Sequence, residues 1–127
     1  MSFSLLTNTD DDAFAITLAA SATTDGCDIT ITGRKAGVQN FEFWISEAAT
    51  GAGLTADTYS GTVTVATGTQ LAALTAKKHL LVQTDATGVA VITAVASANP
   101  TDQYFCVNAG NGTPIVSAVS GTNWEGA

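Results

Sequence analysis

Apolar and polar residues alternate along most of this chain with the two-residue period of a half-buried β-strand. The sequence CDITIT at 27–32 is typical: every second residue is apolar, and the residues between are aspartate or threonine. β-branched residues, which fit a pleated and half-buried surface, are frequent in such segments. The pattern predicts about eight strands, at 13–19, 27–32, 38–46, 62–67, 80–84, 89–96, 104–109 and 115–120.

Glycine, asparagine and aspartate separate these segments, as expected of turns. Gly88 is placed to adopt a positive φ in a hairpin that joins 80–84 to 89–96. The segment 69–78 is different, because Leu71 and Leu74 lie three residues apart. For this segment we predict irregular structure or a single helical turn, since so short a helix is marginal by itself.

Strands at short intervals with no convincing helix between them predict an all-β fold. We expect an immunoglobulin-like or jelly-roll β-sandwich of about seven to nine strands, with extended terminal arms. The chain has 127 residues, which suits one domain. The predicted boundaries are an N-terminal arm at 1–12, the sandwich at 13–120 and a C-terminal tail at 121–127.

Charge narrows the range of partners. The net charge is −7, and the cations are Arg34, Lys35, Lys77 and Lys78. Phosphate backbones and anionic membranes both attract clustered cations, so we expect neither nucleic acid nor a membrane as a partner. The N-terminal sequence also lacks the cationic start of a signal peptide, which favours assembly in a cytoplasm. Charged residues make up 12% of the chain, about half the usual share, which suits a surface covered by neighbours.

Residues that could carry out chemistry are few. His79 is the single histidine, and no cysteine or second histidine lies near it in the sequence. We therefore expect an exposed or interface side chain there and no catalytic residue. The run Asp10–Asp12 could contribute oxygen ligands to calcium, but a solvated turn is the commoner role of such a run. We expect neither a bound metal nor a cofactor.

The two cysteines leave two alternatives open. The order Cys27, Trp44, Cys106 resembles the immunoglobulin pattern, in which a disulfide between the sheets packs on a tryptophan. In a protein made in a cytoplasm, two free buried thiols are the plainer alternative. Trp44 is out of phase with the apolar Phe43, so it could face outward instead. Either way, we expect the cysteines on central strands of opposite sheets.

The terminal arms and one basic pair are candidate contacts with other subunits. Apolar groups on an arm dock either on their own domain or on a neighbour, and both alternatives are open here. The lysine pair either protects a strand edge or meets an acidic neighbouring subunit. The candidate interface residues are Phe3, Leu5, Leu6, Lys77, Lys78 and Trp124.

Two strings carry a resemblance to a known class of proteins. WISEAATGAGLTA at 44–56 and ALTAKKHLLVQTDATGVAVITAV at 73–95 resemble segments of small virion structural proteins of tailed bacteriophages. Within the second, TDATGVAV at 84–91 is also similar to the hairpin of bacterial immunoglobulin-like adhesion domains. The resemblance covers roughly residues 43–95 and includes no catalytic residue.

The resemblance implies a non-enzymatic part of a phage particle that is assembled in the host cytoplasm. The expected role is a capsid decoration or cement protein, a homotrimer that binds the major capsid protein and stabilises the head. The alternative is a tail, neck or fibre-associated immunoglobulin-like module that binds host-surface glycans. That module would need exposed aromatic side chains, for which Trp44, Tyr59 and Trp124 are the candidates.

Overall fold

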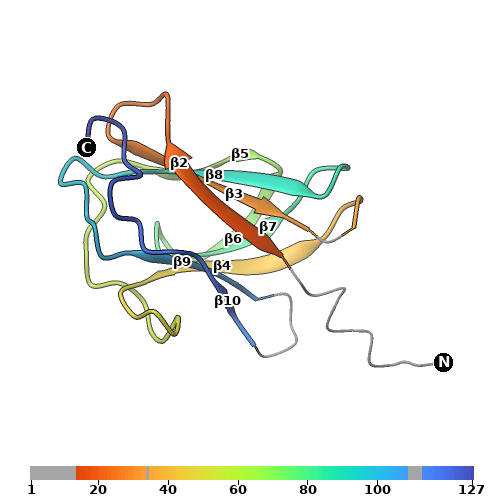
Figure 1. The fold of residues 1–127 in the computed structure, drawn as a ribbon. Helices are drawn as coiled ribbons and strands as arrows, with labels where there is room; N and C mark the ends of the chain where they lie inside the picture. Colours follow the sequence, from red (N-terminus) through yellow and green to blue (C-terminus); the bar gives the residue numbers. More distant parts are fainter. Residues whose placement is uncertain (1–13, 34, 109–112) are drawn as a thin grey trace.

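The protein folds as two β-sheets packed face to face (Figure 1). The computed structural model describes residues 14–33, 35–108 and 113–127. Within these residues the regular elements are nine strands, and every strand pairing is antiparallel. The predicted all-β sandwich is therefore confirmed, while the predicted N-terminal arm lies outside the described residues.

Each sheet combines strands that are distant in the sequence. The four-stranded sheet has the order β2 (Ala15–Ala20), β3 (Gly26–Thr32), β8 (Val89–Val95), β5 (Val63–Thr67). The five-stranded sheet has the order β10 (Ile115–Val116), β9 (Tyr104–Asn108), β4 (Asn40–Ser46), β7 (His79–Gln83), β6 (Thr69–Thr75). At one side of the sandwich the two edge strands are β5 and β6, which follow each other in the chain.

Alternate residues of the strands fill the space between the sheets. Ile29 and Ile31 on β3 are fully buried, as are Phe43 and Ile45 on β4. The ring of Phe43 stacks on that of Phe105 from β9, with the ring centroids 6.2 Å apart. Each large apolar side chain buried in this way stabilises the fold by roughly 1.5–3 kcal/mol. The period-two pattern of the sequence is therefore the pattern of the core.

β6 is the strand that the sequence pattern missed. Its ladder with β7 shifts register between Gln70 and Ala72 and again between Ala73 and Thr75. Leu71 and Leu74 are the residues left without a partner, so each is the extra residue of a β-bulge. A bulge adds one residue to the normal period of two, which explains why the leucines lie three apart. The prediction of irregular or helical structure at 69–78 was wrong for this reason.

The turn at 84–88 also differs from the prediction. Gly88 has the expected positive φ, 87°. However, β7 belongs to the five-stranded sheet and β8 to the four-stranded one, so the turn crosses between sheets and does not close a hairpin. The Asp85 carboxylate organises it by accepting hydrogen bonds from the backbone N–H groups of Thr87 and Val89. The hydrogen bond from the Thr87 hydroxyl, together with these backbone bonds, lowers the pKa of Asp85.

Candidate functional surfaces

The motif that begins at Trp44 builds a closed loop over the five-stranded sheet. Glu47 accepts hydrogen bonds from the Thr55 hydroxyl and from the N–H of Ala56, both at 2.9 Å. The N–H of Thr55 donates to the carbonyl of Ile45 on β4, at 2.7 Å. These bonds join the two ends of the loop, residues 45–47 and 55–56, to each other. The acidic and threonine positions of the motif are therefore explained by local structure.

The centre of the same loop covers a cysteine. The indole N–H of Trp44 donates to the carbonyl of Gly51, at 2.9 Å. Gly51 has a φ of 79°, and a Cβ there would lie 3.1 Å from Val116 and 3.3 Å from the sulfur of Cys106. The positive φ disfavours any other residue at this position, and these two contacts would be tighter than a Cβ normally makes. Trp44 faces outward, as its phase in the strand indicated, and it holds the loop over Cys106.

The structure decides between the alternatives for the cysteines. Both are fully buried and both are free thiols. They lie on β3 and β9, so the prediction of central strands in opposite sheets is confirmed. Cys27 belongs to the core, but Cys106 pairs with Trp44 in the ladder and shares its outward direction. The disulfide alternative is wrong because one sulfur lies between the sheets and the other lies outside them.

The side chain of Trp124 is part of the hydrophobic core and is not exposed on the surface. Its side chain is 1% exposed, and its indole N–H donates to the carbonyl of Pro100 at 2.8 Å. Its ring lies 6.1 Å from the ring of Tyr59. The backbone N–H of Glu125 then joins the tail to the first residue of β3, donating to the carbonyl of Gly26. Of the two alternatives for Trp124, docking on its own sandwich is observed, so the interface prediction is wrong for this residue.

A buried polar network lies beside Trp124. The hydroxyl of Tyr59 donates to the side-chain carbonyl of Gln103, at 3.1 Å. The amide nitrogen of Gln103 donates to the carboxylates of Asp57 and Asp102, both at 2.9 Å. Burial, together with the Asp102 and Glu47 carboxylates, raises the pKa of Asp57. Burial, with Asp57 as a second cause, also raises the pKa of Tyr59.

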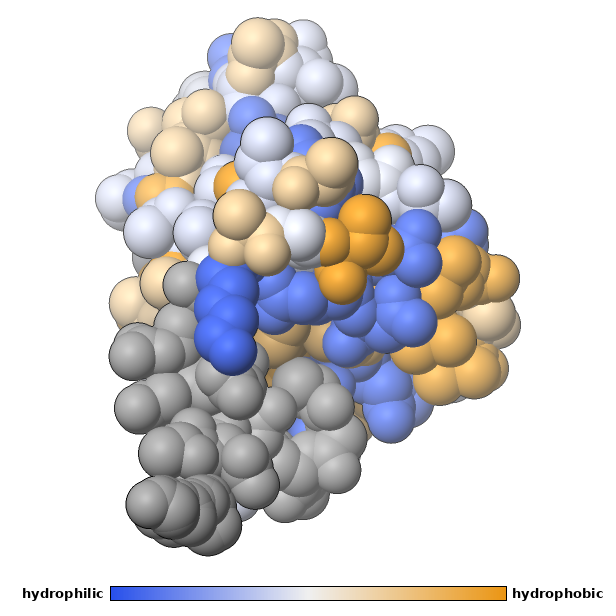
Figure 2. All heavy atoms as spheres, turned by 90° about the vertical axis from the view of Figure 1, so that its right-hand side faces the viewer, coloured by the Kyte–Doolittle hydropathy of each residue, from blue (hydrophilic) through white to orange (hydrophobic). Residues whose placement is uncertain are grey.

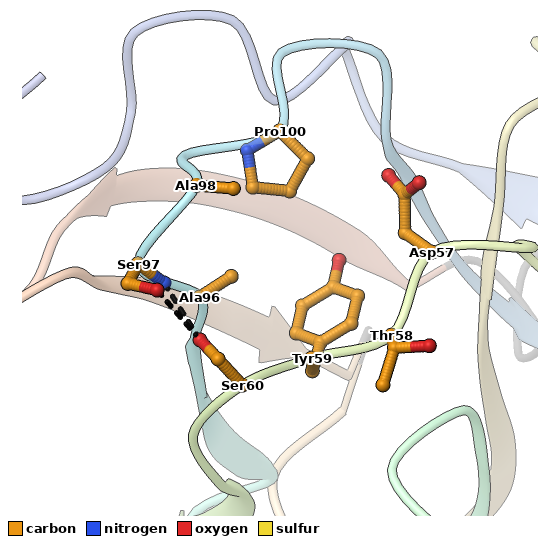
Figure 3. Close-up of a pocket in the computed structure, with 8 residues that line it drawn as sticks. All are labelled: Asp57, Thr58, Tyr59, Ser60, Ala96, Ser97, Ala98 and Pro100. Atoms are coloured by element: carbon orange, nitrogen blue, oxygen red, sulfur yellow. Dashed lines mark hydrogen bonds between the residues drawn. The ribbon is translucent and has the colours of Figure 1, made fainter.

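A small pocket opens next to this network. Figure 3 shows the ring of Tyr59 standing among the pocket residues, with Asp57 on one side and Ala96 on the other. The hydroxyls of Ser60 and Ser97 are hydrogen-bonded to each other at 3.0 Å. The lining residues are Asp57, Thr58, Tyr59, Ser60, Ala96, Ser97, Ala98 and Pro100. The tyrosine and serine hydroxyls and one carboxylate oxygen of Asp57 are all hydrogen-bonded within the protein, so the pocket shows no polar group set aside for a ligand among these residues.

His79 lies on the outer face of the five-stranded sheet. Its Nε2 is 2.9 Å from a carboxylate oxygen of Glu42, and its ring meets that of Trp44 edge-on. The side chains of His79 and Glu42 are 25% and 49% exposed, so the pair is solvated. Among the described residues, no group of three or more histidine, cysteine or acidic side chains could hold a metal ion. Asp10–Asp12, the calcium alternative, lie outside the described residues.

The lysine pair occupies the turn between β6 and β7. Lys77 has a φ of 65°, and its ammonium donates to the carbonyl of Tyr59 at 3.0 Å. Lys78 lies close enough to Asp57 to lower the pKa of that carboxyl, opposing the larger effect of burial. Both lysines therefore have contacts within their own chain. Phe3, Leu5 and Leu6, the other interface candidates, lie outside the described residues.

Comparison with known protein families gave no matching family, and comparisons with curated protein sequences and with solved structures gave no match either. In the part of the chain that the structure describes, no helix is long and apolar enough to cross a membrane.

Some features could not be read from the sequence. Gln103 is fully buried and joins Tyr59 to two carboxylates, but an isolated glutamine before a strand gives no signal of this. The exposure of Leu71 and Leu74 was also missed, although their three-residue spacing was visible. A Leu-x-x-Leu spacing inside an uncharged, threonine-flanked segment could have indicated a bulged edge strand.

Proposed function

We propose that this protein is a non-enzymatic structural component of a tailed-phage particle, most simply a decoration or cement protein on the head. It binds the major capsid protein through a broad, weakly charged surface. Extra contacts of this kind stabilise an assembled shell by mass action, without chemistry. The resemblance of residues 43–95 to small phage virion proteins supports the proposal, and so does the nature of one sheet face.

The outer face of the four-stranded sheet is the main structural feature that supports the proposal. Asp28 is the only charged residue within its four described strands. Its carboxylate accepts a hydrogen bond from the hydroxyl of Thr93 at 2.7 Å, so it is already partnered. The register places small uncharged side chains outward across all four strands: Thr17, Thr30, Thr64, Thr67, Val91 and Thr93. A solvated sheet face normally carries more charge, so this face suits contact with another protein.

Figure 2 shows the hydropathy of one end of the sandwich. It looks onto the end of the sandwich that carries the turns at 35–39 and 84–88, where a pale upper part lies above a region of hydrophilic side chains with hydrophobic ones beside it. The most exposed large apolar side chain of the described residues, Val38 at 57%, lies in the first of these turns.

The residues that carry the resemblance have structural roles. The most specific of them are Trp44, Glu47, Gly51 and Asp85, and each forms hydrogen bonds that close a loop or a turn. These residues therefore have structural roles in this fold. The glycan-binding alternative needs exposed aromatic rings, and two of its three candidates, Tyr59 and Trp124, are about 1–2% exposed. We therefore do not favour it.

The proposal is tested by locating and counting the protein in virions of the phage that encodes it. A cryo-EM map of the head should show it on the shell, and quantitative mass spectrometry should give hundreds of copies per particle. Recovery with tails from headless particles, or only a few dozen copies, would contradict the head assignment.

Surface variants test which face is used. Thr17→Lys with Thr30→Lys places two cations on the outer face of the four-stranded sheet, and it should reduce the copies bound to heads at least tenfold. Thr50→Lys, in the loop over the other sheet, is the matched control and should leave binding unchanged. Equal binding by both variants would show that this face is not the contact.

A further inference from the structure

The edge strand β6 presents an uncharged and almost wholly exposed surface. Its burial pattern is exposed at every position except the half-buried Ala72. Leu71 is 44% exposed and Leu74 is 55% exposed. No charged residue occurs between Thr58 and Ala76 in the sequence, although the whole chain carries −7. Charge is the usual protection of an edge strand, and here it begins only at the lysines of the turn.

Four consecutive residues of the strand are symmetric in sequence, and its two register shifts are symmetric about the same point. Leu71-Ala72-Ala73-Leu74 reads identically in both directions. The two register shifts fall between Gln70 and Ala72 and between Ala73 and Thr75, so they too are symmetric about the midpoint of the alanine pair. A twofold axis through that midpoint would place leucine against leucine and bulge against bulge. Such self-complementarity is what a twofold interface between identical chains requires.

We propose that β6 is the contact surface of a twofold-symmetric dimer of this protein. The two β6 strands run antiparallel, with Leu71 of one protomer against Leu74 of its partner and Ala72 against Ala73. The large side chains lie at the two ends of the contact and the small ones at its centre. This dimer is independent of the proposed function, because it does not require the protein to bind a phage head.

The charges near β6 are compatible with this arrangement. Two copies of a chain with a net charge of −7 repel each other, so they associate most easily where like charges do not meet. In the antiparallel register, Lys77 of one protomer lies opposite Gly68 of the other, and Lys78 lies opposite Thr67. The lysine pairs of the two protomers therefore sit at opposite ends of the contact.

The bulges favour a second copy over an unrelated strand. They interrupt the regular ladder that a foreign strand would need in order to add to the edge. A second β6 carries the same interruptions at symmetric positions, so its leucines can pack where the ladder is broken. One strand edge is a small interface, well below the roughly 1,200 Å² of stable complexes, so the dimer should be weak. The predicted oligomer also differs from the one that the phage resemblance implies: a twofold contact gives a dimer, whereas the resemblance implies a trimer.

Sedimentation or light scattering of the purified protein tests the proposal. The apparent mass should rise from one chain toward two between about 10 µM and about 1 mM, as expected of a weak complex. Leu71→Thr with Leu74→Thr retains strand-forming residues but removes both apolar contacts, and it should remain at the mass of one chain. Val38→Thr with Val119→Thr removes two other exposed apolar residues, 57% and 40% exposed, and should behave like the wild type.

Cross-linking tests the register directly. Residues directly opposite each other in an antiparallel pair have Cβ atoms about 4.5–5.5 Å apart, close to disulfide reach. An oxidised mixture of Ala72→Cys and Ala73→Cys should give several-fold more covalent dimer than either variant alone. In the mixture the two cysteines lie directly opposite each other on the same face of the sheet. In a single variant the two copies of the cysteine are on opposite faces, because successive side chains of a strand alternate between faces. Cys27 and Cys106 do not interfere, since both are fully buried.

Three outcomes would overturn the proposal. They are a single-chain mass at all concentrations, a trimer that forms equally well without the two leucines, and equal cross-linking in the mixture and in the single variants. None of these outcomes bears on the head-binding test, which counts copies on particles. Circular dichroism of each variant shows that it is folded before its mass is interpreted.

Discussion

Cys27 and Cys106 are both fully buried, but they lie on different sides of the five-stranded sheet. Cys27 points into the core between the sheets, while Cys106 points outward beneath Gly51. The order of cysteine and tryptophan in the sequence resembles that of disulfide-bonded immunoglobulin domains. The arrangement differs from that of those domains because the side chain of Cys106 in β9 points out of the sandwich and cannot reach Cys27.

We therefore expect both thiols to stay free under oxidising conditions. The intact mass should equal that of the fully reduced chain, and a thiol reagent should react with neither cysteine until the protein unfolds. The urea midpoint should be the same with and without a reductant, because there is no crosslink to break. A mass lower by two hydrogens in the folded, oxidised monomer would contradict this prediction.

The buried thiols should weaken the fold at alkaline pH. Burial raises the pKa of Cys27 and of Cys106 from 9.0 to about 12, with Asp28 as a second cause for Cys27. Below about pH 9 both the folded and the unfolded chain keep the thiol protons, so stability is unaffected. Between about pH 9 and 12 the unfolded chain releases them first, so the free energy of unfolding falls as the pH rises.

Urea midpoints measured at pH 8 and pH 10.5 test this expectation. The double variant Cys27→Ala, Cys106→Ala should lose less stability than the wild type over this interval, because two of the groups that titrate are gone. Equal losses would show that the thiols do not contribute.

Removal of Trp124 should strongly destabilise the domain, although the residue lies near the end of the sequence. Trp124→Ala empties a site that is 1% exposed, and such a change costs about 3–5 kcal/mol. Trp124→Phe keeps most of the volume but leaves the carbonyl of Pro100 without the indole N–H, so it should cost less. Urea unfolding measures both.

Fluorescence provides an independent check of the same site. In Trp44→Phe the remaining tryptophan, Trp124, should emit at short wavelength and resist quenching by acrylamide. In Trp124→Phe the remaining Trp44, which is only partly buried, should be quenched more readily. The reverse order would contradict the burial of Trp124.

Glu47 should hold the loop over the five-stranded sheet in place. Glu47→Ala removes both of its bonds, to Thr55 and to Ala56, and should cost about 1 kcal/mol. Amide exchange should become faster across 47–56, since the loop is tied at fewer points. Glu42→Ala is the control: its solvated pair with His79 should contribute less than about 1 kcal/mol, and loop exchange should not change.

Gly88 and Gly53 form a matched pair for testing the turn between the sheets. Both have a positive φ, 87° and 73°, but a Cβ at Gly88 would lie 2.5 Å from the carbonyl of Lys35, whereas nothing lies within 4 Å at Gly53. Gly53→Ala should cost about 1 kcal/mol through backbone conformation alone. Gly88→Ala should cost clearly more, because the close backbone contact adds to that strain. Similar urea midpoints for the two variants would contradict this account.

Much of the fold followed from local pattern. Alternation located eight of the nine described strands, because the side-chain period of a strand is a local property of the backbone. β6 escaped because its two bulges change the period, and a bulge forms only against a partner strand. The same limit applied at 84–88, where the positive φ of Gly88 was predictable but the sheet that receives β8 was not.

The candidate surfaces were less predictable than the strands. The uncharged run from Thr58 to Ala76 is visible in the sequence, and it marks β5 and β6 as segments without charge. Only the structure makes β6 an edge strand with both leucines outside. For Trp124 the sequence left docking on its own domain and docking on a neighbour open, and the structure places its side chain in the core.

By itself, the sequence determined the strand pattern, the negative net charge with few cations, and the scarcity of groups that could carry out chemistry, since each depends on residue types and their spacing. The tertiary structure decided which strands share a sheet, which side Cys106 faces, where Trp124 docks and which strand is left at the edge. These features depend on pairing between segments that are far apart in the chain. The energy of such pairing comes from burial and register between partners, which no single segment contains.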